Sequence, residues 1–422
     1  MSKSKEINTY MGELGSKAKH ASQILSQSSL EQKNEALSCI SDEIGKKRDE
    51  ILKENLKDLR LAKEKEIGSA LIDRLELNDD RINSMISGLK VVSDLPDPIG
   101  EVIDLDPTPS GIKVSKMRVP LGVVGIIYES RPNVTADAAA LCLKSGNACL
   151  LRGGSEAILS NKIIWNCLQN GLERSGLPKE CIQLIETTDR AAVKALLRLD
   201  EYLDVIIPRG GKGLVQLISD ESRVPVIKHL DGICHVYIDK NADLMKAEDI
   251  AFNAKTYRYG ICGAMETLLV HSEVASSILP SLNKRFLSEG VELRGCEETK
   301  AIIDVAKASE EDWSTEYLAP ILSIKIVDKT EDAIDHIQRY GSSHTDSIVS
   351  ENQKAVDLFF KNVDSSSVMH NLPTCWADGF EYGLGAEVGI STDKIHARGP
   401  VGLEGLTSQK FIVKGNSHLR GV

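Results

Sequence analysis

The chain has 422 residues, which is enough for two or three domains, each with its own hydrophobic core. Its 51 Lys and Arg residues against 62 Asp and Glu residues give a formal net charge of −11, which argues against a nucleic-acid partner or an anionic membrane surface. Nine cysteines are scattered without the CxxC pairs or the His-rich spacing of a zinc site, so we expect a cytoplasmic protein with reduced thiols, no disulfide framework and no metal site.

Residues 5–95 predict several amphipathic helices, because apolar residues such as Leu37, Ile40 and Ile44 recur at helical spacing. The first residues lack the apolar core of a signal peptide, and no apolar run is long enough to span a membrane. Prolines then interrupt the helical pattern, and residues 112–119 alternate apolar and polar side chains. We therefore expect a half-exposed hairpin over 106–121.

From Gly122 onward, short apolar runs alternate with helical stretches. Strands are expected at 123–127, 148–151, 182–185, 205–207 and 224–227, and helices at 136–144, 160–174, 191–197 and 213–218. Strands that are apolar on both faces and separated by helices predict a parallel sheet with helices on both sides. This α/β architecture is typical of nucleotide binding, and a second βα-rich segment covers 234–400.

Two glycine-rich turns follow expected strands. The turn at 208–213 (PRGGKG) sets Gly210, Gly211 and Lys212 at the start of a helix, where free N–H groups favour the pyrophosphate of a dinucleotide. An ordinary glycine-rich turn is the alternative. The turn at 150–156 (LLRGGSE) offers Arg152 and Ser155 to an adenosine ribose or its 2′-phosphate, although Arg152 could also form a surface ion pair.

Cys262 is the most informative residue of the chain. It lies in NAKTYRYGICGAMETLLV (253–270), after small and polar residues and before a strand-like apolar run. This is the setting of a thiol exposed at the end of a buried element, and a thiolate there can attack an activated carbonyl group.

Several longer motifs carry a family resemblance. They are YESRPNV (128–134), LCLKSGN (141–147), DWSTEYLAP (312–320), YGSSHTDSI (340–348) and HARGPVGLEGL (396–406). With the order of the elements, they resemble the glutamate-5-semialdehyde dehydrogenase (gamma-glutamyl phosphate reductase) family of the aldehyde dehydrogenase superfamily. The resemblance implies a Rossmann-type NADP-binding domain (1–105 and 122–233), an α/β catalytic domain (234–400) and oligomerisation segments (106–121 and 401–422). In that family such segments join subunits, so a homodimer or tetramer is expected.

The resemblance also implies the chemistry. Cys262 would attack L-glutamyl 5-phosphate, expel phosphate and form a thioester, which NADPH then reduces to L-glutamate 5-semialdehyde in proline biosynthesis. Asn133 and the Cys262 backbone N–H would bind the developing oxyanion. Glu316 would hold the nicotinamide ribose, or else be a surface carboxylate. Arg152 and Lys212 are the physical support for NADP over NAD.

His229 falls near the position where hydrolytic aldehyde dehydrogenases carry a water-activating glutamate. The absence of a carboxylate there suits an acyl-phosphate reductase, because a base that activated water would hydrolyse the thioester. A packing histidine is the alternative.

Two segments depart from the resembled family. Tyr257 and Gly263 replace Gln and Asn near the nucleophile, and HNLPTCWADG (370–379) replaces VNASTRFxDG, so that Cys375 stands for Arg, with Trp376 beside it. An Arg would bind an anionic substrate bidentately, so its loss indicates a bulkier pocket for a less anionic carbonyl compound. Such a variant, redesigned or naturally diverged and with or without the native activity, is the alternative function, as is an aldehyde- or amine-binding catalyst without redox turnover. Cys375 is a second reactive thiol or a small buried residue, and His370 is a general base or a loop hydrogen-bonding group.

Overall fold

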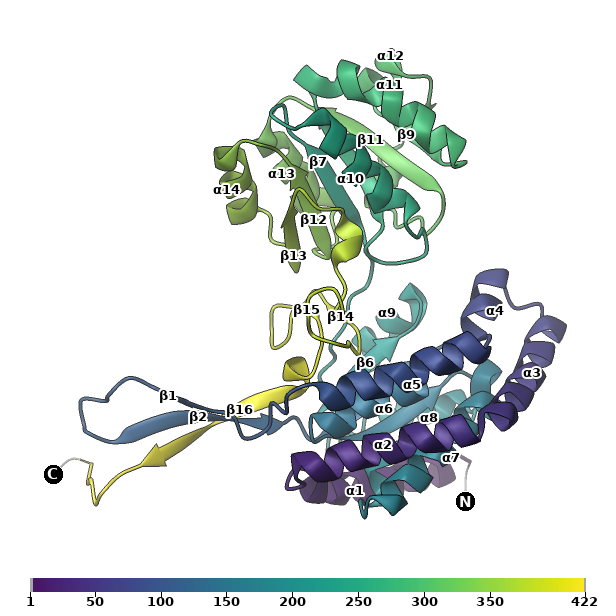
Figure 1. The fold of residues 1–422 in the computed structure, drawn as a ribbon, viewed down its shortest axis with the longest axis vertical. Coiled ribbons are helices and arrows are strands. Elements are labelled where there is room, and N and C mark those ends of the chain that lie inside the picture. The colour runs from purple at the N-terminus through teal and green to yellow at the C-terminus, as the bar shows by residue number, and fades with distance from the viewer. Residues whose placement is uncertain (1–2, 421–422) are drawn as a thin grey trace. The chain divides into compact units, whose positions relative to one another are not determined.

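The computed structural model describes residues 3–420, and the chain divides into two compact units (Figure 1). The first unit comprises the chain up to Lys228, together with Leu384–Gly389 and the segment from Val401 onward. The second unit comprises His229–Gly383 and Ile390–Pro400. The sequence placed the domain boundary between residues 233 and 234, and the two units divide five residues earlier, between Lys228 and His229.

The first unit begins with five helices, as the apolar spacing predicts. They are α1 (Lys3–Leu25), α2 (Leu30–Lys46), α3 (Arg48–Glu64), α4 (Ser69–Leu75) and α5 (Asp79–Asp94). Ser29 and Asn78 cap α2 and α5, because their side-chain oxygens accept the N–H groups of Gln32 and Arg81. The helix α1 packs on the sheet that follows through Met11 and Ala18.

That sheet is parallel and has four strands in the order β5-β4-β3-β6. Its strands are β3 (Val123–Tyr128), β4 (Ala148–Gly153), β5 (Ile182–Leu184) and β6 (Val205–Arg209). Its helices are α6 (Val134–Lys144), α7 (Ile158–Arg174), α8 (Arg190–Leu196) and α9 (Lys212–Glu221). The alternation of strands and helices predicted from the sequence is confirmed.

The prediction of a strand at 224–227 is wrong. Val226 forms a single parallel bridge to Ile206, flanked by hydrogen bonds from Ile206 N to Pro225 O and from Ile227 N to Ile206 O. Pro225 has no N–H group to donate, so a regular ladder cannot continue through it.

A separate antiparallel ribbon also belongs to the first unit. Its strands β1 (Val102–Asp104), β2 (Lys113–Pro120) and β16 (Thr407–Lys414) pair in the order β1-β2-β16. The hairpin was expected to begin at residue 106, but its first strand already begins at Val102. The C-terminal strand β16 pairs with β2 along its whole length. Phe411 and Val413 of β16 remain 64% and 58% exposed.

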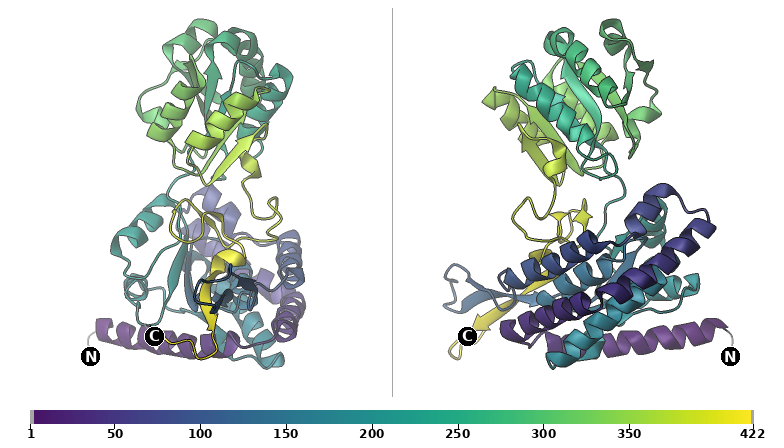
Figure 2. Two further views of the ribbon diagram at one scale, coloured as in Figure 1. Left: turned by 90° about the vertical axis from the view of Figure 1, so that its left-hand side faces the viewer. Right: turned by 45° about the vertical axis from the view of Figure 1, so that its right-hand side comes forward.

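The second unit is built on a seven-stranded parallel sheet with helices on both faces (Figure 2). In the order β10-β9-β11-β8-β7-β12-β13, its strands are Ala306–Lys307, Glu292–Gly295, Ile321–Val327, Met265–His271, Cys234–Ile238, Thr345–Val349 and Ser367–His370. Its helices are α10 (Leu244–Thr256), α11 (Ser272–Ser288), α12 (Glu297–Ile302), α13 (Thr330–Tyr340) and α14 (Gln353–Asn362). A small pair, β14 (Ile390–Ser391) and β15 (Gly399–Pro400), completes the strands, and short 3₁₀ helices occupy Ser155–Ala157, Lys179–Cys181, Glu311–Ser314, Thr374–Trp376 and Glu404–Leu406.

The strand β8 is buried on both faces. Leu268 and Val270 pack with α10 and α11, whereas Leu269 points to the opposite face and packs with α13 and α14. Near its start β8 carries a bulge: Cys234 pairs with Met265 and His235 with Thr267, so that Glu266 is the extra residue. Bulges often occur beside functional groups, and this one lies a few residues after Cys262.

Within the described residues, every helix is too short or too polar to traverse a lipid bilayer. All nine cysteines of the chain are among the described residues and none forms a disulfide.

Candidate active site

Three neighbouring strands of the second unit begin at one edge of its sheet. In the order β8-β7-β12 they start at Met265, Cys234 and Thr345. Because the strands are parallel, the residues just before these positions meet at the same edge. Cys262 in the turn before β8, Cys234 at the start of β7 and His344 before β12 are brought together in this way.

The nucleophile candidate Cys262 is half-buried, and its backbone is held closely by the segment before β7. A Cβ atom built on Gly232 would lie 2.1 Å from the carbonyl oxygen of Cys262 and 2.6 Å from its Cα. Only a glycine allows this approach, since atoms of a real side chain do not come so near to backbone.

Cys234 anchors the same carbonyl group. Its thiol donates a hydrogen bond to the carbonyl oxygen of Cys262 across 3.1 Å. Burial raises the pKa of Cys234 well above the usual range of a thiol, so its sulfur keeps the proton that it donates. Cys234 is therefore a positioning group and not a second nucleophile.

Two imidazoles flank the Cys262 thiol. One ring nitrogen of His229, one of His344 and the Cys262 Sγ all lie within 4.8 Å of one another. The two rings meet edge to face with 5.5 Å between their centroids. His229 Nδ1 lies 3.0 Å from the carbonyl oxygen of Ile390, which can only accept, so Nδ1 carries the proton and Nε2 carries the lone pair.

Sequence reasoning named His229 and left its role open, but it did not single out His344 or Cys234. The signals were present, because His344 lies in the motif at 340–348 and Cys234 follows His229 by five residues. What was missing is the strand order. Cys234 precedes Cys262 by 28 positions and His344 follows it by 82, and only the order of the strands makes them neighbours.

Glu316 is connected to the nucleophile through Gly232. Its Oε1 accepts the N–H of Gly232 across 2.9 Å, and Gly232 is the residue that packs against Cys262. Glu316 is half-buried, and it lies close enough to Glu266 to raise the pKa of that carboxyl group. Its contact with the nicotinamide ribose stays a prediction.

A buried ion pair lies beside the β8 bulge. Lys255 Nζ donates to Glu266 Oε2, and the other carboxylate oxygen accepts the N–H of Leu318 across 3.2 Å. Burial raises the pKa of Glu266 to about 7 although Lys255 opposes it, and burial lowers the pKa of Lys255. Breaking such a pair leaves a buried charge uncompensated, so the pair fixes the end of α10 to the start of β8.

The two segments that depart from the family pattern lie against each other. A Cβ atom on Gly263 would be 3.1 Å from the carbonyl oxygen of Thr374 and 3.5 Å from Cys375 Cα. Cys375 donates to Asn253 Oδ1 across 3.5 Å, and burial raises the pKa of its thiol. The altered loop therefore lies so close to position 263 that a small residue suits this position.

The other three loop residues predicted to line the pocket differ in exposure. Tyr257, which caps α10, is 67% exposed and Trp376 is 44% exposed. His370 Nε2 donates to the carbonyl oxygen of Ser350 across 2.7 Å, which is the hydrogen-bonding role considered for it. A role of His370 as a base stays a prediction.

The residues predicted to bind a dinucleotide lie after strands of the first unit. Gly211 caps α9, Lys212 is the first residue of that helix, and the N–H of Gly211 donates to Glu129 Oε2 across 3.0 Å. A phosphate bound there would take the place of this carboxylate. The exposed glycines 210 and 211 after a parallel strand and before a helix otherwise fit a pyrophosphate group.

Arg152 and Ser155 follow β4. Arg152 is 7% exposed, so it is not the surface residue that the ion-pair alternative requires. Its guanidinium donates to the carbonyl oxygens of Gly153 and, across 3.4 Å, of Thr188, and burial lowers its pKa. Ser155 is exposed. Their roles toward an adenosine ribose or its phosphate stay predictions.

Asn133 immediately precedes α6 in the first unit. Its Nδ2 donates to Asp137 Oδ2 across 2.8 Å, and burial raises the pKa of Asp137 to about 6. One N–H of the amide is thereby fixed in direction. The pairing of Asn133 with an oxyanion on Cys262 stays a prediction.

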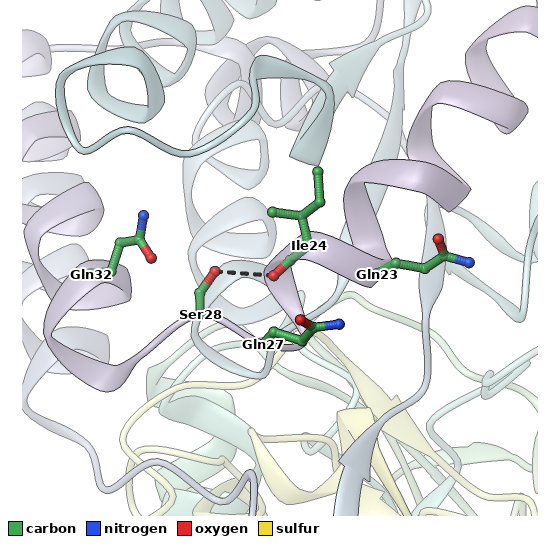
Figure 3. A pocket seen from close by; sticks show the side chains of 5 residues that line it. All are labelled: Gln23, Ile24, Gln27, Ser28 and Gln32. Carbon is green, nitrogen blue, oxygen red and sulfur yellow. Dashed lines mark hydrogen bonds between the residues drawn. The ribbon is translucent and has the colours of Figure 1, made fainter.

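A surface hollow between α1 and α2 has different chemistry (Figure 3). Its lining consists of Gln23, Ile24, Gln27, Ser28 and Gln32. The Ser28 hydroxyl donates to the carbonyl oxygen of Ile24 across 3.3 Å, and the other four side chains are amides and an isoleucine. The hollow has no activated nucleophile among these five residues.

Comparison with known proteins places these features in a family. A model of the aldehyde dehydrogenase family matches residues 10–293. A gamma-glutamyl phosphate reductase from Thermotoga maritima is 44% identical, with 97% of this chain and 99% of that chain covered and a TM-score of 0.95. A gamma-glutamyl phosphate reductase from Saccharomyces cerevisiae is 33% identical over 100% of both chains, with a TM-score of 0.55.

A more distant structure, an acetylating aldehyde dehydrogenase from Geobacillus thermoglucosidasius, shares the fold at 18% identity with a TM-score of 0.71 over 99% of both chains. The resemblance inferred from the sequence motifs is confirmed, as is the α/β fold class. Enzymes of this family use a nicotinamide cofactor, and an engineered glycolyl-CoA reductase of the same fold binds NADP+. The chain belongs to the aldehyde dehydrogenase family, and among its relatives it is similar to the gamma-glutamyl phosphate reductases.

Proposed function

We propose that the protein reduces L-glutamyl 5-phosphate to L-glutamate 5-semialdehyde with NADPH, a step of proline biosynthesis. The observation that carries the proposal is the setting of the half-buried Cys262. Cys234 anchors the backbone carbonyl group of this residue, and His229 and His344 flank its sulfur. Similarity to two gamma-glutamyl phosphate reductases over nearly the whole chain supports the choice of substrate.

The first step is acyl transfer to Cys262. The thiol loses its proton to a neighbouring imidazole, and the Nε2 lone pair of His229 is suited to accept it. The thiolate attacks the carbonyl carbon of the acyl phosphate, a carbon–sulfur bond forms, and phosphate leaves with the electron pair of the broken carbon–oxygen bond. The backbone N–H of Cys262 and the Asn133 amide stabilise the oxyanion.

The second step reduces the thioester. The bound nicotinamide cofactor supplies the hydride, and Glu316, Lys212, Gly210 and Gly211 are the residues proposed to hold it. Addition of hydride to the thioester carbonyl gives the alkoxide of a thiohemiacetal on Cys262. Its collapse breaks the carbon–sulfur bond, releases the semialdehyde and restores the thiolate. Lys212 and Arg152 support NADPH over NADH, because each brings positive charge to a turn that follows a parallel strand.

The imidazole of His229 lies beside the nucleophile, and it falls near the position where hydrolytic aldehyde dehydrogenases carry a water-activating glutamate. Its Nδ1 is committed to the carbonyl oxygen of Ile390. Once Nε2 has accepted the thiol proton, this imidazole has no lone pair left with which to deprotonate water. The thioester therefore lasts long enough to be reduced.

The test is reduction of glutamyl phosphate by the purified protein, followed as loss of NADPH or of NADH in parallel reactions. Replacing Cys262 by Ala should lower turnover by more than about 1,000-fold. Cys296→Ala, which removes a half-buried thiol of the second unit outside the predicted pocket, is the matched control and should keep most of the activity. Acetyl phosphate, an acyl phosphate without the α-amino and α-carboxylate groups of glutamyl phosphate, is the comparison substrate, and reduction of acetyl phosphate without turnover of glutamyl phosphate would refute the proposed substrate.

We also propose that the protein is a homodimer or homotetramer that works in the cytoplasm. The antiparallel ribbon supports the assembly, because Phe411 and Val413 expose apolar surface on an edge strand. Nine free thiols support a reducing compartment. Mass measurement in solution tests the assembly, and Phe411→Glu should shift the protein toward the monomer.

A further inference from the structure

We propose that Cys262, His229 and His344 form a binding site for one divalent cation of the Zn²⁺ class, and that an ion bound there blocks the nucleophile. The cluster was not predicted from the sequence, because its three residues are spread over three strand connections. The metal would be an inhibitor of the enzyme and not a participant in the reaction.

The spacing of the ligand atoms suits a tetrahedral ion. Zn–S and Zn–N bonds of about 2.3 and 2.0 Å place tetrahedral ligand atoms roughly 3.3–3.6 Å apart. The Cys262 sulfur and one nitrogen from each histidine lie within 4.8 Å of one another. Side-chain rotations that bring each atom in by less than about 1 Å would close the site.

The hydrogen bonds of His229 orient it as a metal ligand. Its Nδ1 donates to the carbonyl oxygen of Ile390 across 3.0 Å, which fixes the neutral tautomer with the lone pair on Nε2. A backbone carbonyl on the far nitrogen is the usual outer-shell partner of a metal-binding histidine.

His344 has a comparable arrangement. Its Nδ1 lies 2.9 Å from Thr345 Oγ1 and 3.6 Å from Cys234 Sγ. The proton of Cys234 is donated to the carbonyl oxygen of Cys262, so Cys234 Sγ and Thr345 Oγ1 can both accept the N–H of a His344 ring protonated at Nδ1, the tautomer that metal binding through Nε2 requires. The lone pair of His344 is then on Nε2, as in His229.

The donor set selects the kind of ion. A thiolate with two neutral imidazoles suits Zn²⁺, Co²⁺ and similar ions, whereas Mg²⁺ and Ca²⁺ prefer oxygen ligands. Three protein ligands leave a fourth position for water. Binding forms a sulfur–metal bond and releases the proton of the Cys262 thiol, so the lone pair that would attack the acyl phosphate is engaged.

Cobalt(II) provides a readout that does not depend on turnover. The protein, titrated with CoCl₂ under reducing conditions, should bind one ion per chain and develop the near-ultraviolet charge-transfer band of a cobalt–thiolate bond. Cys262→Ala should abolish the band, and His229→Ala should weaken binding roughly 100-fold or more, since even outer-shell partners account for 10–100-fold. Cys375→Ala is the matched control and should leave the band unchanged. His344→Ala is a second ligand variant, and circular dichroism checks its fold because His344 is buried.

Zinc protection gives an independent measurement. ZnCl₂ should slow alkylation of Cys262 by iodoacetamide, identified by peptide mass, and should inhibit turnover until a chelator is added. Binding of Co²⁺ without a thiolate band, or equal affinity in the Cys262→Ala variant, would overturn the proposed site. Because neither the band nor the alkylation uses a substrate, a failure of the proposed enzyme activity would leave this inference standing, and the two are distinguishable.

Discussion

The thiol of Cys234 donates to the carbonyl oxygen of Cys262 across 3.1 Å, so that one buried cysteine positions the turn that carries another. The donor begins β7 and the acceptor precedes β8, which are adjacent strands of the sheet. The bulge between these strands adds Glu266, and Glu266 is held by Lys255. The nucleophile is thus fixed from both sides by buried polar contacts.

The first prediction concerns this hydrogen bond. Cys234→Ala removes the donor, and we expect kcat to fall roughly 5-fold, the rate equivalent of about 1 kcal/mol. Cys234→Ser keeps a donor and should retain more activity than the alanine variant. Cys181→Ala, which removes a fully buried thiol from the first unit, is the control for the loss of buried volume. Equal rates for the serine and alanine variants would show that the donor has no positioning role.

The second prediction concerns three glycines near the nucleophile, which should differ in their tolerance of alanine. A Cβ on Gly260 meets nothing within 4 Å, one on Gly263 lies 3.1 Å from Thr374 O, and one on Gly232 lies 2.1 Å from the Cys262 carbonyl oxygen. We expect Gly260→Ala to be nearly neutral, Gly263→Ala to cost about 1 kcal/mol, and Gly232→Ala to cost about 3 kcal/mol or more.

Urea unfolding measures these stabilities, and alkylation of Cys262 measures whether the thiol has moved. An order in which Gly260→Ala is the most damaging would contradict the close approach of the chain at Gly232. If the pocket loop adjusts to the Cβ at 263, Gly263→Ala should alter the KM for the acyl phosphate more than it alters stability.

The third prediction, which rests on the proposed function, is that one substitution converts a phosphate-dependent enzyme into a hydrolytic one. In the oxidative direction the wild type should need inorganic phosphate to release the thioester. His229→Glu introduces a carboxylate beside Cys262 that can activate water, and a general base contributes about 100-fold or more. We expect the variant to oxidise the semialdehyde to glutamate without phosphate.

The control is His229→Gln, which removes the imidazole without adding a base and should stay dependent on phosphate. The measurement is NADPH formation from semialdehyde with and without phosphate, with glutamate determined separately. Unchanged phosphate dependence in His229→Glu would mean that residue 229 does not reach the water that attacks the thioester.

Much of this arrangement follows from local sequence. Cys262 is recognisable from its own neighbours, and runs such as 267–270 predict strands buried on both faces because consecutive residues are apolar. The strand expected at 224–227 failed because its apolar residues are interrupted by Pro225, whose missing N–H matters only once the neighbouring strand is known.

The contacts of His344 and Cys234 could not be predicted in this way. They depend on β12, β7 and β8 being neighbours, which is a property of the whole sheet. Arg152 shows the same limit, since an arginine after a strand has no local signal for burial, and its partners include Thr188 from a later connection. Sequence pattern therefore identifies elements and single reactive groups, whereas the order of the strands determines which groups meet.

The last prediction concerns stability in acid and depends on His336 of α13. This histidine is 4% exposed and packs against Trp313 and Tyr340, and Lys325 Nζ lies 3.3 Å from its Nδ1. Burial lowers the pKa of His336 to about 2, and its electrostatic interactions with the neighbouring His235, Lys325 and Arg339 act in the same direction. The folded protein therefore keeps this imidazole neutral, whereas the unfolded chain protonates it near pH 6.5.

Because the folded pKa lies below the unfolded value, the stability contribution is complete above pH 6.5 and is lost as the pH falls below it. His336 alone should lower the free energy of unfolding by up to about 1.4 kcal/mol for each pH unit between 6 and 4. Glu266 acts oppositely, since its raised pKa favours the folded state as the pH falls from 7 toward 4.5, so the comparison must be made between variants. Urea unfolding at several pH values should show a shallower loss of stability in acid for His336→Leu than for the wild type, while the exposed His20→Gln keeps the wild-type slope. Parallel curves for the wild type and His336→Leu would show that His336 is protonated in the folded protein as readily as in the unfolded chain.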